Sequence, residues 1–224
     1  MSLKPLPHPE HPNPYVVLHR RFFYDSPWIR LREDRFRHRR GANGNYVVCG
    51  FQRIACGVLA LDDEDQVVLV GQWRYPLEIY SWEIPEGGGD ASESPFEAIQ
   101  RELAEEAGLQ ARVWEPLCFF HPSNSSTEEE AFLFLATGLS PAEGHHAEED
   151  EELALHREPF GHCLQRVLSG EITDSLSVMA LLALQARRSG VASELDPGLG
   201  ERFFQRPVDH PSAGRARWGA LDTP

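Results

Sequence analysis

Residues 87–109 constrain the fold more than any other stretch of this 224-residue chain. A run of glycines opens the stretch, and strong signals for a short helix follow it. Ser94 can cap the helix, Pro95 suits its first position, and Glu97 stands where a capping box requires an acid. Gly108 can adopt the left-handed conformation that ends a helix. The stretch therefore predicts a glycine loop that leads into a helix.

The predicted helix has an apolar face and an acidic face. The apolar residues recur at helical spacing and should face the core: Phe96, Ile99, Leu103 and Ala107. Glu102, Glu105 and Glu106 share a second face, roughly 100° away. Like charges at this spacing destabilise a helix by roughly 0.2–0.5 kcal/mol per pair, and a bound cation would remove that cost. The acidic face is either an ordinary solvated surface or a metal site.

The whole stretch follows the pattern Gly-x5-Glu-x7-Arg-Glu-(apolar)-x-Glu-Glu-x-Gly-(apolar). Every specified position is matched: Gly87, Glu93, Arg101, Glu102, Leu103, Glu105, Glu106, Gly108 and Leu109. This pattern resembles the Nudix box, the signature of hydrolases that cleave diphosphates linked to another group. The resemblance favours the metal site over the solvated surface.

Flanking segments resemble one branch of that family, the ADP-ribose and nucleoside-diphosphate-sugar pyrophosphatases. A strand-like segment precedes the core, residues 72–76 resemble the branch's Gln-x-Arg element, and residues 83–87 resemble its Glu-Leu-Pro-Ala-Gly element. The resemblance implies an α/β fold, a Nudix α/β/α sandwich around a mixed β-sheet with an N-terminal β-strand subdomain.

The chain is expected to have four parts. They are a proline-rich arm at 1–14, an N-terminal strand subdomain at 15–53, a Nudix hydrolase domain at 54–190, and a C-terminal extension at 191–224. In the resembling branch such a strand subdomain helps form a homodimer, and we expect the same of residues 15–51. The extension is poor in pattern, which indicates a tail or a segment that follows the surface.

Periodicity predicts the main elements of the central part. Strands are expected at 57–61, 66–71, 111–120 and 131–136, and helices at about 160–168 and 174–188.

The resemblance implies a divalent metal centre that takes Mg²⁺, or Mn²⁺ in its place, because such hard cations favour oxygen ligands. Glu102 and Glu106 are expected to be direct ligands, with Glu105 either a ligand or a catalytic group beside them. The backbone carbonyl of Glu86 is expected to be a further ligand, although the family usually has alanine there. The remaining box residues are expected to brace the loop and the helix: Gly87, Glu93, Arg101 and Gly108.

A general base is expected on a late acidic loop, residues 140–152. In the resembling branch the base is a glutamate in a Glu-x-Glu-x-(apolar) setting. Glu151 fits this setting as the first choice and Glu149 as the second. The alternative is that the five consecutive acids form only a solvated loop.

Four residues are candidates for substrate binding. Arg74 can clamp a phosphate through paired hydrogen bonds, or it can form an ordinary surface ion pair. Glu83 and Glu129 match positions of the branch's motifs, the latter in a Ser/Thr-x-Glu element. Trp28 can stack on a base or pack in the core.

The substrate expected from the resemblance is ADP-ribose or a related nucleoside-diphosphate sugar. One departure weakens the choice of ADP-ribose, because Asn124 and Ser125 stand where ADP-ribose hydrolases commonly carry a proline-glycine pair. A hydrolase of nucleotide sugars such as GDP-mannose is therefore an alternative. A catalytically silent nucleotide sensor is another, although such modules usually lose box carboxylates.

The bulk composition narrows the range of partners. A formal net charge of −14 argues against a surface that holds nucleic acid or anionic membrane. A local surplus of arginines between residues 20 and 40 either protects strand edges or attracts an anionic substrate. Four scattered cysteines and an N-terminus without a signal-peptide pattern lead us to expect a cytoplasmic protein.

Overall fold

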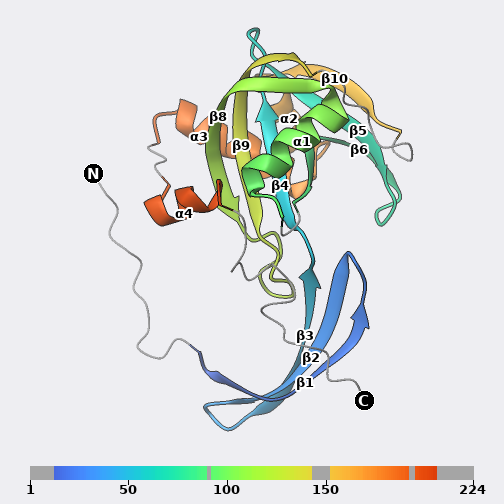
Figure 1. The fold of residues 1–224 in the computed structure, drawn as a ribbon, viewed down its shortest axis with the longest axis vertical. Coiled ribbons are helices and arrows are strands. Elements are labelled where there is room, and N and C mark those ends of the chain that lie inside the picture. Colours follow the sequence, from blue (N-terminus) through green and yellow to red (C-terminus); the bar gives the residue numbers. More distant parts are fainter. Residues whose placement is uncertain (1–12, 90–91, 143–151, 192–194, 206–224) are drawn as a thin grey trace.

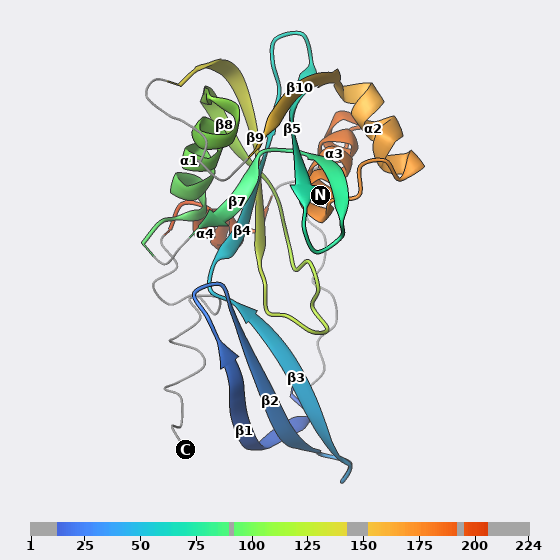
Figure 2. The same cartoon turned by 90° about the vertical axis from the view of Figure 1, so that its right-hand side faces the viewer.

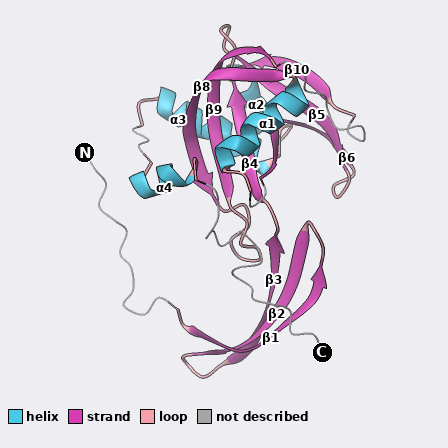
Figure 3. Ribbon diagram, in the orientation of Figure 1, coloured by secondary structure: helices cyan, strands magenta, loops and turns pink. Residues whose placement is uncertain are grey.

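The structure is a computed structural model, and it describes residues 13–89, 92–142, 152–191 and 195–205. In these residues the chain forms three β-sheets and four helices (Figures 1 and 3). Both predicted base candidates, Glu149 and Glu151, and most of the predicted N-terminal arm lie outside the described residues.

The first sheet projects from the core of the molecule (Figure 1). Its strands are β1 (Tyr15–Asp25), β2 (Ile29–His38) and β3 (Asn43–Phe51), paired antiparallel in chain order. Alternating apolar and charged residues favour such strands, and short turns join them.

The core contains two further sheets. One is a mixed sheet in the order β7 (Glu86–Gly89), β4 (Ile54–Ala60), β9 (Ala131–Pro141), β8 (Leu109–Phe120). The other is antiparallel, in the order β10 (Ala154–Pro159), β5 (Gln66–Arg74), β6 (Ile79–Glu83). We expected a single mixed sheet. A strand has only two edges, and because β4 pairs with β7 and β9, the next strand β5 joins a separate sheet.

Helices cover both sides of the two sheets (Figure 2). Helix α1 (Pro95–Ala107) lies on one side, and α2 (Phe160–Ser169) and α3 (Ser175–Arg188) lie on the other. Two hydrophobic clusters fill the layers, one beneath α1 and one beneath α2 and α3. Val58 and Leu59 of β4 are both fully buried and belong to different clusters, because successive side chains of a strand point to opposite faces. The expected α/β/α layering is confirmed.

The described part of the C-terminal extension packs more deeply than a surface segment would. It forms α4 (Pro197–Arg202), and the following Phe203 is fully buried, with its ring centroid 5.1 Å from those of Phe132 and Phe134. Leu195 and Leu199 pack against the same cluster. Their spacing of four residues is helical, but it is too short a pattern to stand out in the sequence.

Four elements were not predicted: β6, β7, β10 and α4. Strand β7 reads Glu-Gly-Gly-Gly and contains no strand-forming side chain, β10 is short and mixed in character, and α4 has only six residues. The helices at 160–169 and 175–188 agree with prediction. In the described part of the chain, no helix is long and apolar enough to cross a membrane.

Candidate active site

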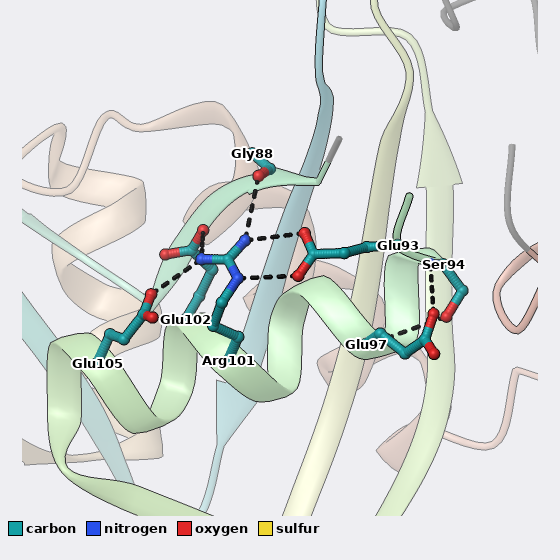
Figure 4. Close-up of polar contacts among 7 residues, drawn as sticks. All are labelled: Gly88, Glu93, Ser94, Glu97, Arg101, Glu102 and Glu105. Atoms are coloured by element: carbon teal, nitrogen blue, oxygen red, sulfur yellow. Dashed lines mark hydrogen bonds and ion pairs between the residues drawn. The ribbon is translucent and has the colours of Figure 1, made fainter. Parts of the chain in front are cut away.

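Helix α1 begins and ends at the residues that the sequence indicates. The Ser94 side chain accepts a hydrogen bond from the Glu97 N–H at 3.1 Å, and the Glu97 carboxylate accepts one from the Ser94 N–H at 2.8 Å (Figure 4). At the other end, Gly108 has a φ of 63° and its N–H bonds to carbonyls of the last turn. These caps fix the length and the direction of the helix that carries the acidic face.

The acidic face of α1 lies against the glycine strand β7. A Cβ built on Gly87 would overlap the carboxyl group of Glu102, so only glycine lets this side chain approach the backbone. The N–H of Glu86 donates to the Glu106 carboxylate at 2.9 Å. Strand β7 and helix α1 therefore bring the backbone of residues 86–87 together with two box carboxylates.

Arg101 joins the glycine strand, the loop and the helix (Figure 4). Its guanidinium donates twice to Glu93, at 2.9 and 3.1 Å, and once each to Glu102 and Glu105, at 2.8 Å. It also donates to the Gly88 carbonyl at 3.3 Å. The bonds to Glu93 and the neighbouring carboxylates raise the pKa of Arg101 above its ordinary value. One guanidinium thus faces three carboxylates, and the cluster keeps a net negative charge.

A second acidic group lies nearby. Carboxylate oxygens of Glu83, Glu86 and Asp174 lie within 4.8 Å of one another. Arg74 donates to both Glu83 and Glu86, the latter at 2.8 Å, and its bonds to Glu83 raise its pKa. Burial and the nearby Asp174 raise the pKa of the Glu86 carboxyl well above its usual range. The sequence marks Asp174 only as a helix cap, and nothing in it distinguishes a capping aspartate from one that faces a site.

An open cavity of about 370 Å³ lies beside these groups. It is lined by Arg74 and Glu86, by Gly87 and Gly88 of β7, and by Asp174 at the start of α3. The cavity also reaches the 121–130 loop and the segment between β3 and β4. Cationic and anionic groups from five parts of the chain therefore meet at one opening.

Comparison with known proteins agrees with this geometry. The family model described as NUDIX domain matches residues 51–161. An ADP-ribose pyrophosphatase of Mycobacterium tuberculosis is 35% identical over 142 residues, which cover 62% of this chain and 68% of the relative. The chain belongs to the Nudix family.

Two other relatives and one solved structure extend the comparison. An ADP-ribose pyrophosphatase of Bacillus subtilis is 33% identical and a methanol dehydrogenase activator of Bacillus methanolicus is 35% identical, each over 60% of this chain and 74% of the relative. A crystal structure of an ADP compounds hydrolase superposes with a TM-score of 0.71 at 21% identity, covering 80% of this chain and 98% of that one. That structure supports the Nudix fold.

Trp28 lies at the surface of this Nudix protein. Its side chain is 62% exposed, so the expectation that it could pack in the core is wrong. The guanidinium carbon of Arg53 lies 4.8 Å from the centroid of the indole ring, and Arg53 also lines the cavity. Arg53 was not predicted as a site residue, because a single arginine between two strands carries no recognisable signal.

Glu129 lines the cavity from the 121–130 loop. Burial raises the pKa of its carboxyl group. The loop is tied to the N-terminal sheet, because the Cys49 N–H donates to the Ser126 carbonyl at 2.9 Å and the Tyr46 hydroxyl donates to the Ser125 carbonyl. The segment that departs from the ADP-ribose hydrolase pattern therefore contacts the strand subdomain.

The predicted metal ligands fit a hard divalent cation. Glu102 lies against the backbone of Gly87, and Glu106 accepts from the Glu86 N–H, so the residues that the Nudix resemblance names are neighbours in space. All the donors are oxygens, as Mg²⁺ and Mn²⁺ prefer, and no thiolate is among them. Glu105 is held by Arg101 at the edge of the same group.

Proposed function

We propose that this Nudix hydrolase cleaves the diphosphate of ADP-ribose or a related nucleoside-diphosphate sugar, with release of a nucleoside monophosphate and a sugar phosphate. The observation that carries the proposal is the acidic face of α1 packed against β7 at the rim of a cavity that contains Arg74. Two relatives that align over most of the core are named ADP-ribose pyrophosphatases, which supports the substrate class.

The metal proposed is Mg²⁺, with Mn²⁺ as a substitute. Glu102, Glu106 and the carbonyl of Glu86 would hold it, and Glu105 would support them. When bound, such a cation neutralises diphosphate charge and supplies activated water. The part that this chain plays is to keep the carboxylates together, through the bonds of Arg101 to Glu102 and Glu105 at 2.8 Å.

Arg74 and Arg53 are proposed to hold the substrate. Both line the cavity, and Arg74 presents a fork of donors that suits phosphate oxygens. Glu83 and Glu86 accept from Nε and Nη2 of Arg74, which leaves Nη1 of the guanidinium to face the substrate. The exposed ring of Trp28 offers a stacking surface for a base, and Glu129 offers a carboxyl group for a sugar hydroxyl.

Glu151 is proposed as the general base, with Glu149 as the paired alternative. Glu152, the last residue of the acidic run, lies two residues before Ala154, which pairs with Gly71 of the strand that carries Arg74. A carboxylate near phosphorus can accept the proton of the attacking water. We expect the Glu151→Gln variant to lower kcat by roughly 10²-fold, the usual scale of base loss, and Glu149→Gln to lower it less.

A homodimer through residues 15–51 is proposed as the assembly. The N-terminal sheet carries a set of exposed large apolar side chains: Tyr15, Val16, Val17, Leu18, Phe23, Tyr24, Tyr46 and Val47. A second copy of the chain would cover them, because a surface of this kind marks an interaction site.

A panel of nucleoside-diphosphate sugars assayed with Mg²⁺ tests the function. ADP-ribose should give AMP and ribose phosphate, and EDTA should abolish the reaction until Mg²⁺ is restored. Faster cleavage of GDP-mannose than of ADP-ribose would select the nucleotide-sugar alternative, which Asn124 and Ser125 favour. Tight binding of a nucleotide without turnover of any member would replace catalysis by a sensor role.

A further inference from the structure

The turn between β6 and β7 carries two of the site's acids, Glu83 and Glu86, and its backbone is held at each end. The Pro85 carbonyl accepts a hydrogen bond from the Val58 N–H at 3.0 Å. The Glu86 N–H donates to Glu106. Pro85 itself has no N–H to satisfy. The turn is therefore tied both to the centre of the sheet and to the box helix.

The remaining donor of the turn is the N–H of Ile84, and its partner comes from a distant helix. This group donates to the hydroxyl oxygen of Ser177 at 2.9 Å, across 93 residues of sequence. Ile84 and Ser177 are both fully buried. Because a buried N–H without an acceptor is costly, the Ser177 hydroxyl fixes the position of the turn relative to α3.

The same turn of α3 also places an acid in the site. The Ser177 N–H donates to the Asp174 carboxylate at 2.7 Å, which caps the helix. The capped Asp174 lies with Glu83 and Glu86 in the group of carboxylates within 4.8 Å of one another. One turn of α3 thus fixes the backbone position of the β6–β7 turn through Ser177, and it also places the carboxylate of Asp174 beside Glu83 and Glu86.

We propose that Ser177 is a positioning residue for the hydrolysis, acting through Ile84 on the Glu86 backbone and on the carboxylates that orient Arg74. This inference deepens the proposed function and depends on it. Ser177 itself is enclosed in the core and touches no substrate. Loss of its hydroxyl releases the Ile84 N–H and lets the turn shift, so the metal-binding oxygens at residues 86 and 106 no longer hold their mutual position.

Ser177→Ala tests the inference, with Mg²⁺ dependence as the principal readout. We expect the Mg²⁺ concentration for half-maximal activity to rise roughly 10-fold, the scale on which groups behind metal ligands act. Ser189→Ala, at the exposed end of the same helix, is the matched serine control and should keep the wild-type value. Leu181→Ala, fully buried in α3, serves as a control for lost stability.

The comparison of the two buried variants decides the matter. Leu181→Ala should lower the unfolding temperature with an unchanged Mg²⁺ requirement, whereas Ser177→Ala should change that requirement. A Ser177→Ala enzyme with the wild-type Mg²⁺ requirement would overturn the inference and leave Ser177 a purely structural residue. If the wild type cleaves no substrate, the proposed function fails instead. Calorimetric titration of both proteins with Mn²⁺ then tests the same expected 10-fold weakening.

Discussion

The box region and the N-terminal sheet differ in whether their side chains find partners within the chain. Around α1 and β7, charged groups find partners within the same chain, and Arg101 alone joins three carboxylates and a carbonyl. The sheet β1–β3 pairs some of its charges too, as in Arg20 with Asp34 at 2.6 Å. Many of its apolar side chains, however, remain exposed, with Val16 at 60% and Val47 at 52%.

The two regions therefore differ in what stabilises them. The box must hold like charges together, which requires dense internal pairing. Exposed apolar side chains gathered on a three-stranded sheet mark a surface that can bind another chain. The 121–130 loop joins the two regions, since it carries Glu129 into the cavity and contacts β3 through Ser126.

Glu106→Gln should lower kcat by roughly 10²–10³-fold, the scale on which a preorganised electrostatic contact acts. The amide oxygen can still accept the Glu86 N–H, so the fold and the unfolding temperature should change little. Steady-state kinetics at saturating Mg²⁺ and thermal unfolding measure the two effects. Glu115→Gln, at an exposed acid of β8, is the control. A near-normal rate for Glu106→Gln would show that the acidic face does not hold a catalytic cation.

Gly87→Ala should lower turnover by roughly 10²-fold, because displacement of reacting groups by about 1 Å has effects of that size. The added methyl group overlaps the Glu102 carboxyl group and forces it away from β7. Gly161→Ala is the matched control, since a Cβ at that position meets no atom within 4 Å. Kinetics of the two variants side by side measure the effect, and equal rates would contradict the close approach seen here.

Val47→Asp should dissociate the proposed homodimer and halve the mass measured by light scattering. A carboxylate buried against a second copy would lose its hydration without gaining a partner. Val113→Asp places the same change on an exposed valine of β8, away from the N-terminal sheet, and should leave the mass unchanged. A wild-type protein that is monomeric at micromolar concentration would remove the basis of this prediction.

Glu129→Gln should have the smallest effect. It should raise the unfolding temperature of the metal-free protein at neutral pH. Burial raises the pKa of Glu129, so the folded protein holds this proton more tightly than the unfolded chain does. Wild-type stability therefore falls as pH rises from the ordinary carboxyl pKa through the raised one, and glutamine escapes that loss. Thermal unfolding in EDTA between pH 4 and 8 should show curves that converge below about pH 4. A constant difference across this range would contradict the assignment.

The sequence alone determined the box and its helix. Ser94, Glu97 and Gly108 predict the helix ends because capping depends on neighbours within a few residues. The need for glycine at position 87 and the bracing by Arg101 also involve short distances along the chain. Such local interactions can be predicted from the spacing of residues, and the structure contains the predicted helix caps.

Only the tertiary structure decided the rest of the site. Asp174, Ser177 and Arg53 lie far from the box in sequence, and each has an ordinary local role as a helix cap, a helical residue or a residue between strands. The deep burial of Phe203 was likewise invisible. Contacts between distant segments depend on which strand edges and helix faces meet. A single sequence records the residues on those faces and does not record their pairing, because burial is decided by the whole fold.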